Sequence, residues 1–168
     1  MSRIYILRHA KAANPFPGQK DFERPLTQSG MEAASRLGAW MAAQGLVPDT
    51  ILCSPALRTR QTLEQVGSFF RSEVPVLYQQ ALYSEDHDAY VDAARSAGNN
   101  KSVMIIGHNP TCEEFASSLV ESGNPAAINK MAPGMKPGAL AIIDLPGTLE
   151  DTGRRNGFLE DFVTEGVA

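Results

Sequence analysis

The sequence predicts an α/β fold, a three-layer α/β/α sandwich with a mostly parallel central sheet of about six strands. Short runs of β-branched and aromatic residues alternate with segments whose apolar residues recur at helical spacing. No internal repeat or low-complexity tract interrupts this alternation. A length of 168 residues is near the common size of one domain and is enough to bury a core. We therefore expect a single domain over residues 1–168.

The first predicted elements are a strand, a loop and a helix. Residues 3–7 are rich in β-branched and aromatic side chains and predict the opening strand. A loop rich in proline and glycine follows at 13–25. Thr27 is the expected N-cap of a helix, because the apolar residues after it recur at helical spacing until Gly45 ends the pattern.

The middle of the chain repeats this order. A second strand is expected at 49–53. Ser54 as an N-cap and Pro55 at the first helical position predict a helix directly after it. A third short strand is expected at 74–78, and a short helix at 87–97.

The last part of the chain contributes the remaining strands. Residues 102–106 form the most apolar strand after the first, and Pro110 opens a helix behind it. A loop rich in proline and glycine then leads to a fifth strand at 139–144. Apolar and polar residues alternate at 157–163, which predicts a sixth strand at an edge of the sheet.

The composition excludes several classes of protein. A net charge of -4, from 15 basic and 19 acidic residues, argues against nucleic acid as a partner. No segment approaches the length of a membrane span, so we expect a cytoplasmic protein without membrane association. Cys53 and Cys112 form no disulfide framework or zinc motif and are expected to be packing residues. A reactive thiol at Cys112 remains an alternative, because this residue lies beside a motif described below.

Unusual polar residues follow three of the predicted strands. Arg8 and His9 come directly after the first strand, and His108 comes after the fourth. Arg58 lies one turn into the helix that follows the second strand. Because the carboxyl ends of parallel strands meet at one edge of a sheet, these four residues are expected to converge.

Two histidines and two arginines at one point suit phosphate chemistry. The planar fork of arginine binds phosphate with two hydrogen bonds and keeps its charge. A histidine beside two guanidinium groups has a lowered pKa, so its imidazole stays neutral and nucleophilic near pH 7. No acidic cluster that would hold magnesium is visible, and we expect neither a metal nor another cofactor. Singly, each residue could be structural; together they favour a site for phosphoryl transfer.

Three motifs in the expected order resemble the histidine phosphatase superfamily, which has the phosphoglycerate mutase-like fold. LRHAKAANP (7–15) resembles its N-terminal RHG-type signature. SPALRTRQTL (54–63) resembles its S-x-x-x-R-x-x-x-T element, and IIGHNP (105–110) resembles its second-histidine element. The small size, the GHNP sequence and Ala10 after the first histidine are most similar to the SixA-type phosphohistidine phosphatases.

The resemblance implies a role for each matching residue. His9 would be the nucleophile that becomes phosphorylated, and Arg8 and Arg58 would clamp the phosphoryl oxygens. His108 would hydrogen-bond the same group in the transition state. Asn14 falls where the superfamily often has a further polar contact to phosphate.

The general acid of many relatives has no firm match. The stretch ALYSEDHDAY offers Glu85 as a candidate, with Asp86 beside it, but a solvated acidic loop is the alternative. His87 is expected at the surface. An imidazole leaves phosphohistidine more easily than an alkoxide leaves an ester, so a missing acid favours an N–P substrate.

The sequence therefore predicts a metal-independent phosphatase with a phosphohistidine enzyme intermediate and inorganic phosphate as product. Its expected substrate is phosphohistidine on a signalling protein, such as a phosphotransfer domain. The alternatives are a small-molecule phosphomonoesterase and a phosphate-binding module without turnover. The loop at 121–137, with Lys130 and Lys136, could fold over the pocket. Arg154 and Arg155 could form a docking patch or only a polar hairpin.

Overall fold

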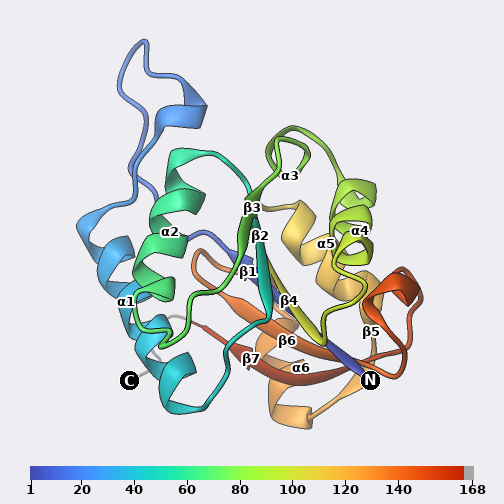
Figure 1. Ribbon diagram of the computed structural model, residues 1–168. Coiled ribbons are helices and arrows are strands. Elements are labelled where there is room, and N and C mark those ends of the chain that lie inside the picture. The colour runs from blue at the N-terminus through green and yellow to red at the C-terminus, as the bar shows by residue number, and fades with distance from the viewer. Residues whose placement is uncertain (165–168) are drawn as a thin grey trace.

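A seven-stranded sheet forms the centre of the protein, in the order β3-β2-β4-β1-β6-β7-β5 (Figure 1). The computed structural model describes residues 1–164. The four strands β3, β2, β4 and β1 run parallel to one another, and β5 runs parallel to β7. Only the β1–β6 and β6–β7 pairs are antiparallel, so the expectation of a mostly parallel sheet is confirmed. The strands are β1 (Ser2–Arg8), β2 (Thr50–Cys53), β3 (Val76–Tyr78), β4 (Ser102–Gly107), β5 (Val120–Gly123), β6 (Leu140–Leu145) and β7 (Gly157–Val163).

Helices cover both faces of the sheet, which confirms the three-layer α/β/α architecture. α1 and α2 lie on one side, and α4 and α5 lie on the other (Figure 1). None of the helices in the described part of the chain is long and apolar enough to cross a membrane. The helices are α1 (Gln28–Ala43), α2 (Leu57–Gly67), α3 (Ala81–Ser84), α4 (His87–Ser96), α5 (Thr111–Leu119) and α6 (Pro125–Met131), with the 3-10 turns η1 (Asp21–Glu23) and η2 (Leu149–Asp151).

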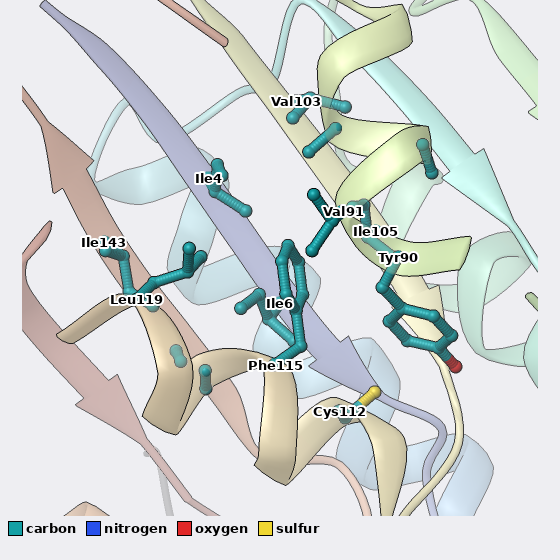
Figure 2. Close-up of a cluster of buried hydrophobic side chains, with 14 of the residues drawn as sticks. Ile4, Ile6, Tyr90, Val91, Val103, Ile105, Cys112, Phe115, Leu119 and Ile143 are labelled. Atoms are coloured by element: carbon teal, nitrogen blue, oxygen red, sulfur yellow. The ribbon is translucent and has the colours of Figure 1, made fainter. Parts of the chain in front are cut away.

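Alternate side chains of β1 pack into two hydrophobic cores, one on each face of the sheet. Ile4 and Ile6 pack beneath α4 and α5, where Figure 2 shows them with Phe115. Tyr5 and Leu7 point to the opposite face and pack with side chains of α1 and α2. Because both faces of β1 are buried at its centre, residues 4–7 are apolar without interruption, as is typical of a central strand.

The C-terminal third differs from the sequence prediction in two elements. The segment expected to be helix end and loop contains the strand β5 and the helix α6. The strand β7 is not an edge strand, because β5 pairs with its outer side and β6 with its inner side. β5 has only four residues and no alternating pattern of burial, so its pairing depends on contact with β7 rather than on a local signal.

One of the two predicted helix caps is confirmed. The side chain of Thr27 accepts a hydrogen bond from the backbone N–H of Gly30, as a capping residue does. Ser54 is not a cap, because α2 begins only at Leu57 and the hydroxyl of Ser54 instead contacts His108. Ser54 is therefore a residue of the functional site and not a helix cap.

Candidate active site

Backbone hydrogen bonds fix Arg8 and His9 at the carboxyl end of β1. The N–H of His9 donates to the carbonyl of Gly107 at 3.1 Å, which extends the β1–β4 pairing past the end of the strand. The carbonyl of His9 accepts from the N–H of Gly138 at 2.9 Å on the other side. The backbone of His9 is therefore held by both neighbouring segments.

The imidazole of His9 is oriented by its own chain. Nδ1 lies 2.7 Å from the carbonyl oxygen of Ala10, and because a carbonyl only accepts, Nδ1 carries the hydrogen. Nε2 is then left with its lone pair. Burial, together with the positive charges of Arg58 and Arg8, lowers the pKa of His9 to about 4, against the opposing effect of the Ala10 hydrogen bond. At neutral pH this side chain is an uncharged nucleophile.

His108 is positioned from the end of β4. Its backbone N–H donates to the hydroxyl of Tyr90 at 3.0 Å, and that hydroxyl donates to the carbonyl of Leu82 at 3.1 Å. Gly107 permits this arrangement, since a Cβ at this position would collide with the Tyr90 hydroxyl. Tyr90 and the absence of a side chain at Gly107 thus set the place of His108.

The ring of His108 faces the ring of His9. The two ring centroids are 5.4 Å apart. Nε2 of His108 lies 2.7 Å from the hydroxyl of Ser54, and when the hydroxyl donates, Nδ1 carries the hydrogen of this imidazole. Burial, followed by the charge of Arg58, lowers the pKa of His108 to about 3. Both histidines therefore stay neutral at pH 7 and are protonated only in much more acidic solution.

Two arginines flank this pair of rings. Arg8 donates from Nη1 to the carbonyl of Met135 at 2.8 Å. Arg58 is buried and donates from Nη1 and Nη2 to the backbone and side chain of Asp21 at 2.8 and 3.0 Å. The structure thus brings Arg8, His9, Arg58 and His108 together, as their positions after three strands imply.

Two buried nitrogens of the site have no hydrogen-bond partner among residues 1–164. They are Nε of Arg8 and Nδ1 of His108. A buried polar atom without a partner costs about 1–3 kcal/mol, so such atoms are rare in folded proteins. Within the described residues both belong to this cluster. Two nitrogens able to donate are what an anionic oxygen ligand would require there.

The sequence interpretation did not single out three residues of the site. Ser54 contacts His108, as described above. Asp21, in η1, accepts hydrogen bonds from Arg58 and from the hydroxyl of Tyr83 at 2.9 Å. The ring of Tyr83 stands edge-on to that of His108, with centroids 5.5 Å apart. Asp21 lies in a three-residue turn and Tyr83 in a four-residue helix, which are too short to show a periodic pattern in the sequence.

Other predicted residues lie at the periphery. Asn14 and Glu85 are exposed, and neither side chain makes a hydrogen bond within residues 1–164, so their roles stay predictions. The loop after α6 does reach the site, because the carbonyl of Met135 accepts from both Arg8 and Asn109. Lys130 and Lys136 are exposed on that segment.

Three further residues have structural roles. Cys112 is fully buried, and its burial raises the pKa of the thiol to about 12, which makes it a packing residue. His87 is half-buried rather than a free surface residue, because Nε2 contacts the hydroxyl of Ser118 at 3.0 Å. Arg155 donates to the carbonyl of Val120 at 3.0 Å and so supports the start of β5.

The arrangement can transfer a phosphoryl group. A neutral imidazole with a free Nε2 is a nucleophile, and the adjacent guanidinium groups can take up charge on phosphoryl oxygens. Among residues 1–164 no group of three or more His, Cys, Asp and Glu side chains gathers as a metal site would.

Comparison with known proteins identifies the family of the chain. The model of the histidine phosphatase superfamily (branch 1) matches residues 4–83. The phosphohistidine phosphatase SixA of Escherichia coli is 30% identical over 127 residues, which are 73% of this chain and 77% of that protein. A crystal structure from Agrobacterium tumefaciens that bears the SixA name matches with a TM-score of 0.81 at 31% identity, over 96% of this chain and 97% of that one.

A more distant structure shares the fold alone. The α-ribazole phosphatase of Shigella flexneri matches with a TM-score of 0.65 at 16% identity, over 99% of this chain and 97% of its own.

The matches to the family model and to the two SixA proteins show that the chain belongs to the histidine phosphatase superfamily and is a phosphatase. Within the superfamily it is of the SixA type, which confirms the resemblance of its three motifs.

Proposed function

We propose that this phosphatase removes phosphate from phosphohistidine on a protein, through a phosphorylated His9. The orientation of His9 carries the proposal. Its Nδ1 is tied to the carbonyl of Ala10, so the free Nε2 is the atom that attacks phosphorus. The bond from phosphorus to the leaving imidazole breaks as the new P–N bond forms, and the leaving nitrogen takes a proton from water. Water then cleaves the phosphorylated His9 to give inorganic phosphate and the free imidazole.

Arg8 and Arg58 stabilise the charge that the phosphoryl oxygens carry in both steps. The unpaired Nε of Arg8 and Nδ1 of His108 are the donors that these oxygens would meet. No metal is needed for this charge neutralisation, since two guanidinium groups supply it.

The proposed substrate follows from the carboxylates near the site. Asp21 is the carboxylate that contacts the cluster among the described residues, and it is bound by three donors. Partial burial opposes ionisation, but hydrogen bonds from Arg24, Tyr83 and Arg58 hold the pKa of Asp21 at about 2. An ionised carboxylate has no proton to give to an alkoxide. The imidazole of phosphohistidine is a better leaving group and can take its proton from water, which favours phosphohistidine over an alkyl phosphate.

The second candidate is a small-molecule phosphomonoesterase. The shared fold with an α-ribazole phosphatase supports it, because this fold also serves small phosphate esters. The third candidate, a phosphate-binding module, differs from both in releasing no phosphate.

Phosphate release distinguishes the candidates. The wild type, His9→Ala and the control His87→Ala are assayed with a phosphohistidine-bearing protein and with p-nitrophenyl phosphate. We expect faster cleavage of phosphohistidine, loss of at least about 10³-fold in His9→Ala, and little change in His87→Ala. Cleavage of the ester alone would favour the small-molecule candidate, and phosphate binding without release would favour the binding module.

A further inference from the structure

Asp21 lies where three parts of the site meet. It opens the turn η1 in the loop between β1 and α1, which stands away from the body of the protein beside α2 (Figure 1). Its Oδ2 accepts from Nη2 of Arg58 at 3.0 Å and from the hydroxyl of Tyr83 at 2.9 Å. Its Oδ1 accepts from Nη1 of Arg24 at 3.0 Å, within the same loop. One carboxylate therefore joins the loop, α2 and α3.

Asp21 holds Arg58 through two points rather than one. Nη1 of Arg58 donates to the backbone carbonyl of Asp21, while Nη2 donates to its carboxylate. A guanidinium has five N–H groups, so two bonds to Asp21 leave three for another acceptor. Asp21 thus fixes the plane of the guanidinium without using up its donors. Otherwise the long arginine side chain would have to be ordered when the substrate binds, at a cost in rotamer entropy.

The same carboxylate also supports the wall next to His108. The ring of Tyr83 lies edge-on between those of His108 and Phe22, with centroid distances of 5.5 and 5.0 Å. The hydrogen bond from Tyr83 to Asp21 fixes the position of the hydroxyl end of this ring. Displacement of Asp21 would therefore loosen Arg58 and the neighbour of His108 together.

We propose that Asp21 is a positioning residue for phosphoryl transfer, which aligns Arg58 and fixes Tyr83 against His108. The inference rests on the proposed function, because it assigns Arg58 to the phosphoryl oxygens. Asp21 is not the general acid in this scheme, because Arg58, Arg24 and Tyr83 all donate to its carboxylate.

The test compares Asp21→Ala and Asp21→Asn with Glu23→Ala. Glu23 is an exposed acid of the same turn and forms no ion pair within residues 1–164, so its removal changes the charge and not the contact. We measure kcat and KM with p-nitrophenyl phosphate, the Kd of inorganic phosphate, and thermal unfolding.

Asp21→Ala is expected to lower kcat about 10²-fold, because a small misplacement of a catalytic group costs about that much. Asp21→Asn should recover part of this loss, since its amide oxygen still accepts from Arg58. The Kd of phosphate should change less than about threefold, because the loss of alignment is offset by the loss of a nearby negative charge. Glu23→Ala should stay within about twofold of the wild type.

Several results would overturn the inference. Equal losses of kcat in Asp21→Ala and Glu23→Ala would show an effect of charge alone. A strongly tightened Kd of phosphate in Asp21→Ala would show that Asp21 competes with phosphate for Arg58. An unchanged kcat would show that the contacts serve only the fold of the loop.

A measurement without turnover separates this inference from the proposed function. The guanidinium N–H signals of Arg58 in NMR spectra, assigned with Arg58→Lys, report whether rotation of its Nη groups is hindered. We expect resolved Nη signals in the wild type and in Glu23→Ala, and averaged signals in Asp21→Ala. If the wild type cleaves no phosphate substrate, the proposed function fails, but these spectra still decide whether Asp21 positions Arg58.

Discussion

The active site has two halves that are built differently. The strand-end half consists of Arg8, His9, Ser54 and His108, and the loop half consists of Asp21, Phe22 and Tyr83. In the strand-end half, sheet hydrogen bonds place the backbone and burial lowers the pKa values of both histidines. In the loop half, side-chain hydrogen bonds of Asp21 hold the short turn η1 against α2 and α3. The sheet topology thus places His9, the proposed nucleophile, while the side chains of the loop half are held by a few polar contacts.

Arg58 connects the two halves, so its replacement should have the largest effect in this comparison. Arg58→Ala removes the proposed phosphate ligand and the partner of Asp21 at once. We expect kcat with p-nitrophenyl phosphate to fall about 10²- to 10³-fold, as for the loss of a preorganised donor. Steady-state kinetics measure this.

Arg60→Ala is the matched control, because Arg60 lies on the same helix but is exposed and donates only to the carbonyl of Pro55. Its kcat should stay within about threefold of the wild type. An equal decrease in kcat in Arg58→Ala and Arg60→Ala would mean that the net charge near α2 determines the rate, and not the contact of Arg58 with both halves.

The two halves should also respond to acid in different pH ranges. The folded pKa values of His9 and His108, about 4 and about 3, lie below the unfolded value of 6.5, so the unfolded state binds more protons between these values. The free energy of unfolding should therefore fall as the pH is lowered from 6.5 toward 4, by on the order of 3 kcal/mol for each histidine at most. Urea unfolding at a series of pH values measures this.

Substitutions in each half show which residues cause the decrease in the free energy of unfolding at low pH. His9→Gln and His108→Gln should each flatten the decrease between pH 6.5 and 4.5. Asp21→Asn should leave it unchanged, because the pKa of Asp21 is held below its ordinary value of 3.8 and its contribution is lost only below that pH. A slope that persists in both histidine variants would contradict the assignment to the strand-end half.

The smallest effect is expected for Glu85→Gln. Glu85 follows α3, next to the loop half, but its side chain is exposed and makes no hydrogen bond within residues 1–164. We expect kcat/KM to change less than about threefold with phosphohistidine and with p-nitrophenyl phosphate, which would favour the solvated acidic loop. A loss above about tenfold, confined to substrates with poor leaving groups, would instead make Glu85 the general acid.

The prediction of the fold succeeded where burial is strong. The apolar runs of β1 and β4 are visible in the sequence because both faces of these strands are buried, and the alternation of strands and helices indicates a parallel sheet. β5 was missed because its pairing with β7 is a long-range contact without a local pattern. The prediction of a helix cap at Ser54, based on the Ser54–Pro55 pair, was also wrong. A serine near the start of a helix can bond a distant side chain, here that of His108 after β4, as readily as a helix N–H.

The sequence by itself determined which four side chains meet at the proposed active site. Arg8, His9, Arg58 and His108 follow the ends of three parallel strands, and parallel strands bring those ends to one edge of the sheet. Only the tertiary structure decided the contacts of Ser54, Asp21 and Tyr83. Their partners are 54, 37 and 62 positions away in the chain, so side-chain packing, rather than any local pattern, selects them.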